Sequence, residues 1–424
     1  MIRILKYGEI EKEKIFERNE KELDVSLAVG EIIKNVKERG DAALFEYTEK
    51  FDGAALSALE VTEAEIEEAF SLMDNDFVEI IREAAKNIEA FHKKQIKEGF
   101  EIKRSDGVVI GQKVTPIEKV GLYVPGGTAA YPSTVLMDSI PAKLAGCREI
   151  VITTPPMKNG KVNPAILTAA KIAGVTRIFK LGGAQAIGAL AYGTETLPRV
   201  DKIVGPGNAY VAEAKRQVFG RVSIDMIAGP SEILVIADAK SNPKYVACDL
   251  LSQAEHDRMA SAVLVTDSME LAYGVQREIE EELKGLSRCD IARASIENNG
   301  KIIVADTIDE VIDVANEIAP EHLEICLDNP FDYLDKIKNA GSIFMGRYCP
   351  EALGDYFAGP NHTLPTSGTA RFSSPLSVDD FVKKSQFTYY TKEALEMVAG
   401  KVARFANEEG LSAHARSATV RVEK

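Results

Sequence analysis

The histidines of this chain are few, and most of them have polar neighbours. Five occur in the sequence, and His92 stands apart, in a helical stretch between Phe91 and Lys93. The others lie in short motifs that also carry acidic or amide side chains: His256, His322, His362 and His414. Any one of these can be an ordinary, partly buried histidine. Because imidazole, carboxylate and amide groups together bind metal ions and transfer protons, the distribution predicts one site drawn from distant segments. We assign His92 to structure.

The segment Gly354–Arg371 brings an acid and a histidine into a stretch rich in helix breakers. It carries Asp355 and His362 among three glycines and two prolines. Glycine and proline interrupt helices and central strands, so we predict a loop here rather than regular structure. A loop of this length inside a domain is usually functional or disordered, and its aromatic and aliphatic residues argue against disorder. We therefore predict an ordered, functional loop.

A second motif, QAEHD, holds a pair of residues that can share a metal ion. Gln253 and His256 are three residues apart and would project from the same face of a helix. With Asp355 and His414, they give two imidazoles, one carboxylate and one amide, a set that suits Zn²⁺ first and Mn²⁺ or Co²⁺ next. The alternative is a row of polar residues on the exposed face of an amphipathic helix.

A third motif, APEHLEI, places Glu321 directly beside His322, just before a short apolar strand. An adjacent carboxylate and imidazole can form a general base that activates water or removes the proton of an alcohol. The structural alternative is that Pro320 and Glu321 begin a helix. The segment by itself does not separate the two.

Three glycine-rich turns indicate a nucleotide site of unusual form. VPGGTAAYP, LGGAQAIG and VGPGNAY each follow a strand and lead into a helix, where backbone amides can meet a pyrophosphate. None completes the GxGxxG pattern: Gly183 and Gly188 hold the outer positions of one turn with Gln185 between them, and Tyr210 replaces the third glycine of another. We predict a dinucleotide bound in an atypical way, although tight turns also need glycine for steric reasons alone.

Composition limits the class of protein. The chain has 424 residues, 45% of them hydrophobic, and a net charge of −14 spread along its length, which disfavours nucleic acid and anionic membranes as partners. The N-terminal residues lack the apolar core of a signal peptide, so we expect a cytoplasmic protein that acts on a small molecule. Five cysteines without CxxC spacing indicate reduced thiols rather than disulfides or a thiolate zinc site.

The order of the elements indicates an α/β protein. Helical periodicity covers about 25–95, and Asp106-Gly107 predicts a hairpin. From Val120 onward, about nine short apolar strands alternate with helices, which is more than one ordinary parallel sheet holds. The segment Ala228–Leu234 is the expected crossing between two sheets. After Pro375 we predict a return to helix.

We therefore expect two incomplete, doubly wound Rossmann-like domains with small helical parts at both ends of the chain. The N-terminal helical arm covers residues 1–24, and the C-terminal helical tail covers 377–424. The first Rossmann-like domain takes 25–119 together with 234–376, and the second, which carries the predicted dinucleotide site, takes 120–233.

Taken in order, QAEHD, PEHLE, GDYFAGPNHTLPTSG and EEGLSAHA, with AGPSEI and VPGG, resemble the histidinol dehydrogenase family over nearly the whole chain. The resemblance implies a zinc-dependent, NAD-linked enzyme that oxidises L-histidinol through L-histidinal to L-histidine, the last step of histidine biosynthesis. It also implies a homodimer whose C-terminal segments are exchanged, so that each site is shared between subunits.

Carried over by motif, the resemblance assigns roles to individual residues. Glu321 and His322 would be the acid/base pair. The implied zinc ligands are Gln253, His256, Asp355 and His414. The implied substrate contacts are these four ligands together with Ser231, His322, His362 and Glu409. The implied NAD contacts are Tyr123, Gln185 and Asn208.

The chemistry of a four-electron oxidation agrees with this assignment. A hydride leaves the alcohol carbon, water adds to the aldehyde, and a second hydride leaves the hydrate, so two NAD molecules are used in turn. Relatives that oxidise other small alcohols, such as sulfopropanediol, are the first alternative, and His362 with Glu409 favours histidinol. A metal-dependent hydrolase or a binding protein on the same scaffold is the second.

Overall fold

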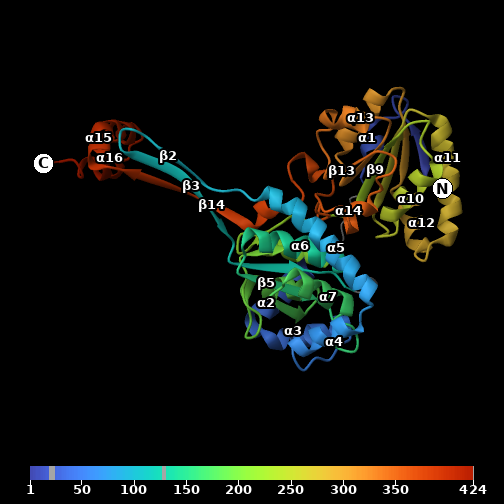
Figure 1. The fold of residues 1–424 in the computed structure, drawn as a ribbon, viewed down its shortest axis with the longest axis horizontal. Helices are drawn as coiled ribbons and strands as arrows, with labels where there is room; N and C mark the ends of the chain where they lie inside the picture. Colours follow the sequence, from blue (N-terminus) through green and yellow to red (C-terminus); the bar gives the residue numbers. More distant parts are fainter. Residues whose placement is uncertain (19–23, 127–129, 424) are drawn as a thin grey trace. The chain divides into compact units, whose positions relative to one another are not determined.

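The computed structural model describes residues 1–18, 24–126 and 130–423. They form two compact units. The main unit comprises Met1–Gln95 and Glu118–Phe381, and the small unit comprises Ile96–Ile117 and Val382–Lys424. The main unit holds two parallel sheets and the small unit holds an antiparallel one (Figure 1).

The first sheet of the main unit has five parallel strands in the order β6-β5-β4-β7-β8. They are β4 (Lys119–Tyr123), β5 (Glu149–Thr154), β6 (Arg177–Lys180), β7 (Lys202–Val204) and β8 (Ser223–Ile224). The helices that follow the first four are α6 (Pro132–Ala145), α7 (Pro164–Ala173), α8 (Gly183–Tyr192) and α9 (Ala209–Val218). The chain winds outward from β4 in one direction and then from β7 in the other. The carboxyl ends of β4 and β7 are therefore the switch point, where such sheets bind ligands.

The second sheet has six parallel strands in the order β1-β11-β10-β9-β12-β13. They are β1 (Arg3–Lys6), β9 (Glu232–Ala237), β10 (Ser261–Thr266), β11 (Lys301–Val304), β12 (His322–Cys326) and β13 (Ser342–Met345). Its helices are α1 (Lys12–Phe16), α10 (Pro243–Ala254), α11 (Met269–Glu282), α12 (Cys289–Asn298) and α13 (Ile308–Ile318). Ile233 and Val235 belong to one hydrophobic core, and Leu234 and Ile236 to another. Both faces of β9 are thus covered, which explains its unbroken apolar sequence.

The predicted fold class is confirmed, because every one of the predicted strands is present in these two sheets. The crossing also lies where it was expected, between the end of β8 at Ile224 and the start of β9 at Glu232. Strands β1 and β8 were not predicted, because they are short and lie at the edges of their sheets.

The four long helices near the N-terminus require a correction to the predicted domains. They are α2 (Ser26–Arg39), α3 (Asp41–Asp52), α4 (Glu63–Leu72) and α5 (Asn75–His92). Val29, Val36 and Leu44 share one core with Val151 and Phe179 of the five-stranded sheet. The segment therefore packs with residues 120–233 and not with 234–376. An amphipathic face shows that a helix must be covered, but it does not say by which sheet.

The N-terminal arm is likewise not only helical. Strand β1 pairs in parallel with β11, Arg3 opposite Lys301, and so extends the six-stranded sheet. Helix α1 contributes Ile15 to a core of the same sheet.

The small unit is built on a three-stranded antiparallel sheet in the order β14-β3-β2 (Figure 1). It contains β2 (Phe100–Lys103), β3 (Val108–Pro116), β14 (Val382–Tyr390), α15 (Lys392–Glu408) and α16 (Ser412–Thr419). The predicted hairpin is confirmed, with Gly107 in the left-handed conformation at φ 83°. The prediction of helix directly after Pro375 is wrong for residues Val382–Tyr390, which form strand β14. Its side chains are almost all exposed, so no alternation of apolar and polar residues marks the strand.

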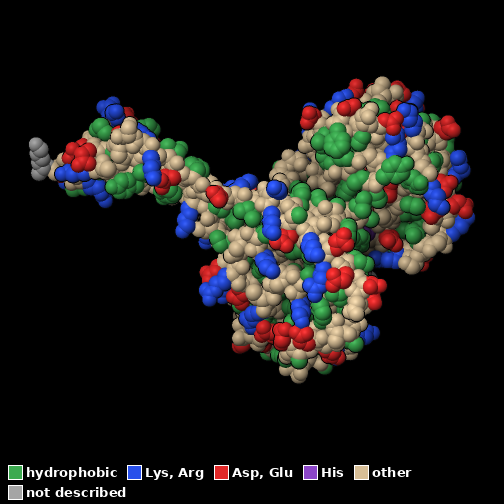
Figure 2. Space-filling model, viewed as in Figure 1, with side chains coloured by type: hydrophobic (Ala, Val, Ile, Leu, Met, Phe, Trp, Pro, Cys, Tyr) green, Lys and Arg blue, Asp and Glu red, His purple; other side chains and the backbone are tan. Residues whose placement is uncertain are grey.

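The surface agrees with the composition. Basic and acidic side chains are interspersed on the face of each unit seen in Figure 2. All five cysteines are free thiols, as predicted. Among the helices that the structure describes, none combines the length and the apolar character needed to cross a bilayer.

Candidate active site

The predicted chemical residues of the main unit gather at the amino ends of β9 and β12. His322 is the first residue of β12 and lies opposite Ile233 of β9, so Ser231 and Glu232 stand next to Glu321. The alternative that Glu321 begins a helix is wrong, because α13 ends at Ile318 and strand β12 begins at His322, the residue after Glu321. Adjacent parallel strands thus bring two distant motifs together.

Helix α10 presents Gln253 from its last turn, and His256 lies just beyond it. The helix ends at Ala254, and the backbone amide of His256 donates to the carbonyl of Gln253 at 3.1 Å. The prediction that Gln253 and His256 project from one helical face is therefore wrong, because His256 lies beyond the end of the helix. Burial lowers the pKa of His322 and of His362, and the nearby His256 acts in the same direction.

His322 is held in one tautomer. Its Nδ1 lies 2.9 Å from the backbone carbonyl of Glu232, and because a carbonyl only accepts, Nδ1 carries the hydrogen. Nε2 is then a lone pair, and it is buried with no hydrogen-bond partner among the described residues. Burial lowers the pKa of His322 to about 4, so the ring is neutral near pH 7. A neutral imidazole with a free nitrogen can accept a proton or bind a metal.

Two carboxylates face this nitrogen. Glu351 precedes the short helix α14 (Ala352–Tyr356), and Asp355 lies within it, so the segment predicted as a loop begins in a helix. The two acids are four residues apart and share one helical face. Oε1 of Glu351 lies 3.9 Å from Nε2 of His322. Burial raises the pKa of Glu351 and of Asp355, and the charge of Asp355 raises the pKa of Glu351 further.

The rest of the segment folds as an ordered loop and carries His362. Nδ1 of His362 lies 3.6 Å from a carboxylate oxygen of Asp355. Nε2 lies 3.3 Å from the hydroxyl of Thr134, a residue of α6. Burial lowers the pKa of His362 to about 4, so this ring is also neutral near pH 7.

Glu321 lies on the other side of His322. Its Oε2 accepts a hydrogen bond of 2.8 Å from the backbone amide of Glu232 and lies 3.6 Å from Nδ1 of His322. Burial raises the pKa of Glu321 well above its ordinary value, while the bond from the Glu232 amide acts in the opposite direction. A carboxylate of raised pKa is a stronger base than one in water.

These groups have the donor chemistry of a cation site. One ligand atom each from His322, Glu351 and Asp355 lies within 4.8 Å of the other two. Within the described parts of the chain, Nε2 of His322, Oε1 of Glu351 and Oε1 of Gln253 are buried without a partner. Buried acceptors that face one another without a donor need a proton or a metal ion between them. The residues present therefore fit a bound divalent cation.

This cluster overlaps only in part with the predicted ligand set. Asp355 belongs to both sets. Gln253 lies beside the cluster, with its side-chain nitrogen 3.2 Å from Nδ1 of His322. Glu351 belongs to the cluster but was not predicted as a ligand. The available signal was the spacing of four residues between Glu351 and Asp355 in EALGD. Of the remaining predicted residues, Glu409 directly follows α15 and His414 lies in α16, so both belong to the small unit, where both are exposed.

The predicted cofactor residues lie at the carboxyl ends of the five-stranded sheet. Tyr123 ends β4, and its buried hydroxyl accepts a hydrogen bond of 3.1 Å from the amide of Gly183. Asn208 caps α9 by accepting from the amide of Tyr210 at 3.0 Å. Gln185 is buried in the first turn of α8, and its Oε1 has no partner in the described structure. An unpaired amide oxygen past the carboxyl end of β6 fits a polar ligand. The turn VPGGTAAYP includes 127–129, which lie outside the described residues.

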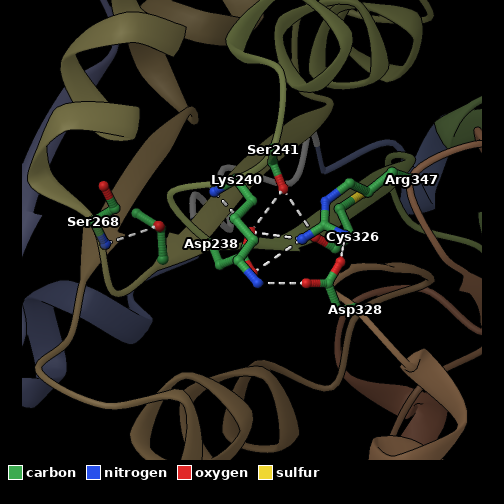
Figure 3. A network of polar contacts seen from close by, with 8 residues as sticks. Asp238, Lys240, Ser241, Ser268, Cys326, Asp328 and Arg347 are labelled. Carbon is green, nitrogen blue, oxygen red and sulfur yellow. Dashed lines mark hydrogen bonds and ion pairs between the residues drawn. The ribbon is translucent and has the colours of Figure 1, made fainter.

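The switch point of the six-stranded sheet has a different character. Past the ends of β9 and β12, Arg347 bridges Asp238 at 2.8 Å and also contacts Asp328, to which Lys240 donates at 2.6 Å (Figure 3). The turns that directly follow β9 and β12 contain no glycine, and their charged side chains are paired with one another. A pyrophosphate therefore meets no glycine-rich turn at these strand ends. Of the two sheets, the five-stranded one is therefore the better dinucleotide site.

Comparison with known proteins agrees with these features. The family model described as histidinol dehydrogenase matches residues 16–422. Histidinol dehydrogenase from Clostridium acetobutylicum is 57% identical over 99% of both chains, and that from Geobacillus kaustophilus is 58% identical over 94% of both. The crystal structure of histidinol dehydrogenase from Elizabethkingia anophelis superposes with a TM-score of 0.94 at 41% identity, covering 99% of this chain and 98% of that one.

Proposed function

Because the chain belongs to the histidinol dehydrogenase family, we propose that it oxidises L-histidinol through L-histidinal to L-histidine with two molecules of NAD and a divalent cation. The observation that carries the proposal is the group of buried His322, buried Glu351 and half-buried Asp355, with Glu321 directly beside it. It combines a cation site with a base in one unit. The same unit carries the glycine turns at the carboxyl ends of β4, β6 and β7.

In the first half-reaction an alcohol becomes an aldehyde. The C–H bond of the carbinol carbon breaks with its electron pair, and the hydroxyl proton leaves to a base. His322 suits this role, since its Nδ1–H is fixed on the carbonyl of Glu232 and its Nε2 lone pair is free. A neutral ring that gains a proton here becomes an imidazolium next to Glu321 and Glu351, and each of these groups stabilises that charge in its ionised form.

In the second half-reaction the aldehyde becomes a carboxylate. Water adds to the aldehyde carbon to give a hydrate, and the C–H bond of that carbon then breaks as before. Glu321 is placed to take the proton from the attacking water, because its raised pKa makes it a stronger base than an exposed glutamate. Its position is fixed by the hydrogen bond from the Glu232 amide.

The cofactors would be held by different parts of the chain. For a cation we propose Gln253, His256, Asp355 and His414 as ligands, a set of nitrogen and oxygen donors that favours Zn²⁺ and admits Mn²⁺ or Co²⁺. When bound, the cation orients the imidazole and amine nitrogens of the substrate. For NAD, which accepts the hydride, we propose Tyr123, Gln185 and Asn208. Ser231, His322, His362 and Glu409 would contact the substrate together with the metal ligands.

A spectrophotometric assay tests the function. Absorbance of NADH is followed after L-histidinol and NAD are added to zinc-loaded protein, and the product is identified by mass spectrometry. We expect two NADH for each L-histidinol consumed and L-histidine as the product. Sulfopropanediol in place of L-histidinol is the control for the related alcohol dehydrogenases. Turnover of sulfopropanediol without turnover of L-histidinol would contradict the proposal.

We further propose that two chains form a homodimer in which the small unit of each completes the site of the other. Glu409 and His414, two of the proposed site residues, belong to this unit. The long helix α15 is amphipathic, and Met397, Val402 and Phe405 are exposed on it. Apolar side chains of this size need a surface to cover, and exchange of one element between identical chains is a low-cost route to a symmetric dimer.

Complementation between inactive variants tests the exchange. His256→Ala and His414→Ala are each expected to be inactive. When the two are unfolded and refolded together, each mixed dimer should have one site with both lesions and one with neither. About a quarter of all sites should then be intact, and activity should return to about that fraction of the native value.

The matched control is co-refolding of His256→Ala with Asp355→Ala. Both lesions lie in the main unit, so every site of a mixed dimer keeps one of them and no activity should return. If mass spectrometry shows mixed dimers of His256→Ala with His414→Ala and these have no turnover, each site is built from a single chain.

A further inference from the structure

The loop that carries His362 is fastened to α6 at three successive residues. Asn361 donates its side-chain amide to the carbonyl of Met137 at 2.6 Å. The ring of His362 contacts the hydroxyl of Thr134 through Nε2. The hydroxyl of Thr363 donates to Oδ1 of Asp138 at 3.0 Å. A helix of the five-stranded sheet thus holds the histidine that faces Asp355.

Asp138 is the least expected member of this group. Its side chain is completely buried, whereas the neighbouring positions of α6 are apolar or small. Burial raises the pKa of Asp138 to about 8, and the charge of Asp225 acts in the same direction. Near pH 7 the group is therefore a neutral carboxyl whose Oδ1 still accepts from Thr363.

Asp138 also lies against the turn that leads to Asn208. A Cβ placed on Gly205 would lie 2.2 Å from the carbonyl oxygen of Tyr123 and 3.2 Å from Oδ2 of Asp138, so the backbone of Tyr123 requires glycine here and Asp138 packs closely against it. The amide of Gly205 donates to Asp225 at 2.8 Å, and its carbonyl accepts from Lys215 at 3.0 Å. Lys215 and Asp225 form a buried ion pair. The backbone next to Asp138 is therefore fixed by hydrogen bonds to both the amide and the carbonyl of Gly205.

A buried carboxyl costs free energy that an apolar side chain of the same size does not. Packing alone would be served better by leucine, which has nearly the same shape. What leucine cannot do is accept the hydrogen bond of Thr363, the residue next to His362. The hydrogen bond to Thr363, and not packing in the core, thus explains why an aspartate stands at position 138.

We propose that Asp138 is a positioning residue, which acts through Thr363 to hold His362 in the orientation that receives the substrate. The inference rests on the proposed function, in which His362 contacts L-histidinol. Without the bond to Thr363, the loop samples other positions, and only the fraction of molecules with His362 in place binds substrate. Apparent affinity falls by that fraction, while molecules that do bind react as before.

Two substitutions at the same position separate positioning from packing. Asp138→Leu keeps the number and branching of the side-chain heavy atoms and removes the acceptor, whereas Asp138→Asn keeps an oxygen that can accept from Thr363 and is neutral, like the buried carboxyl. We expect Asp138→Leu to raise the KM for L-histidinol by about tenfold, the effect of one lost hydrogen bond, and to change kcat by less than about threefold. Asp138→Asn should restore KM to within about threefold of the native value.

A double-mutant cycle with Thr363→Val gives a second, independent measure. Thr363→Val is nearly isosteric and removes the same hydrogen bond from the other side, so it should raise KM by a similar factor. If both residues act through one contact, the double variant Asp138→Leu/Thr363→Val should be no worse than either single variant. Multiplicative effects on KM, or a KM unchanged in Thr363→Val, would overturn the proposal. Thr363→Val also serves if Asp138→Leu does not fold.

Histidine side-chain NMR tests the orientation without any turnover. The zinc-loaded protein labelled at histidine gives five ring signals at most, and the signal of His362 is the one missing from His362→Asn. It should shift or split in Asp138→Leu and in Thr363→Val and stay in place in Asp138→Asn. An unchanged His362 signal in both of the first two variants would show that Asp138 only fills the core. Because this measurement needs no substrate, it still decides the role of Asp138 if the wild-type protein fails to oxidise L-histidinol.

Discussion

Removal of bound metal with a chelator is expected to abolish oxidation of L-histidinol, with a loss of at least about 10³-fold, and Zn²⁺ or Mn²⁺ should restore it. The reason lies in the ligand atoms of His322, Glu351 and Asp355, which lie within 4.8 Å of one another, with Nε2 of His322 and Oε1 of Glu351 buried without a partner among the described residues. A cation removes this mutual repulsion and gives the substrate nitrogens a fixed point of attachment. Full activity in protein shown to be metal-free by mass spectrometry would exclude a catalytic metal.

Three variants decide which residues hold the cation. Asp355 belongs both to the proposed ligand set and to the compact cluster, so Asp355→Ala should lose zinc in either case. His256→Ala should also lose zinc if the proposed set is right, and His322→Asn should keep close to one zinc per chain while losing most of its turnover. The measurement is metal content after dialysis against buffer without zinc. The opposite result, with zinc kept in His256→Ala and lost in His322→Asn, would make His322, Glu351 and Asp355 the ligands.

Much of the fold was predictable because strands buried on both faces have a distinctive sequence. The stretches that became β9 and β10 are unbroken apolar runs followed by helices, and this pattern is typical of the strands of parallel sheets. β14 carries no such mark, since its side chains are exposed in a small antiparallel sheet. The partner of α2 could not be predicted either, because its apolar face fits either sheet equally well at the level of pattern.

The site was predictable where its residues stand in polar motifs and not where they act through packing. Glu321 and His322 were found because a carboxylate beside an imidazole has an obvious use. Glu351 was missed because a single glutamate before a short helix is common. Asp138 was missed because in sequence it is one polar residue inside a helix, and only the fold reveals that it is fully buried and bonded to Thr363.

Glu321→Gln is expected to slow oxidation of L-histidinal by about 10²- to 10⁴-fold, the usual contribution of a general base. The amide is nearly isosteric with the acid but cannot take a proton from water. Oxidation of the alcohol should be affected much less, because His322 keeps its bond to the Glu232 carbonyl and its free Nε2. The two half-reactions are separated by giving the enzyme L-histidinal directly and by counting NADH formed in a single turnover of L-histidinol.

The matched control is Glu232→Gln, since Glu232 contacts the pair through its backbone, while its side chain pairs with Arg18 and acts on Glu321 only through its charge. It should oxidise both substrates within about threefold of the native rate, because an amide at this position leaves both backbone contacts in place. Zinc content should be normal in both variants, so that any loss in Glu321→Gln belongs to proton transfer. One NADH per L-histidinol in a single turnover of Glu321→Gln, with L-histidinal as the product, is the result we expect. Two NADH at the native rate would show that Glu321 is structural and that another group activates the water.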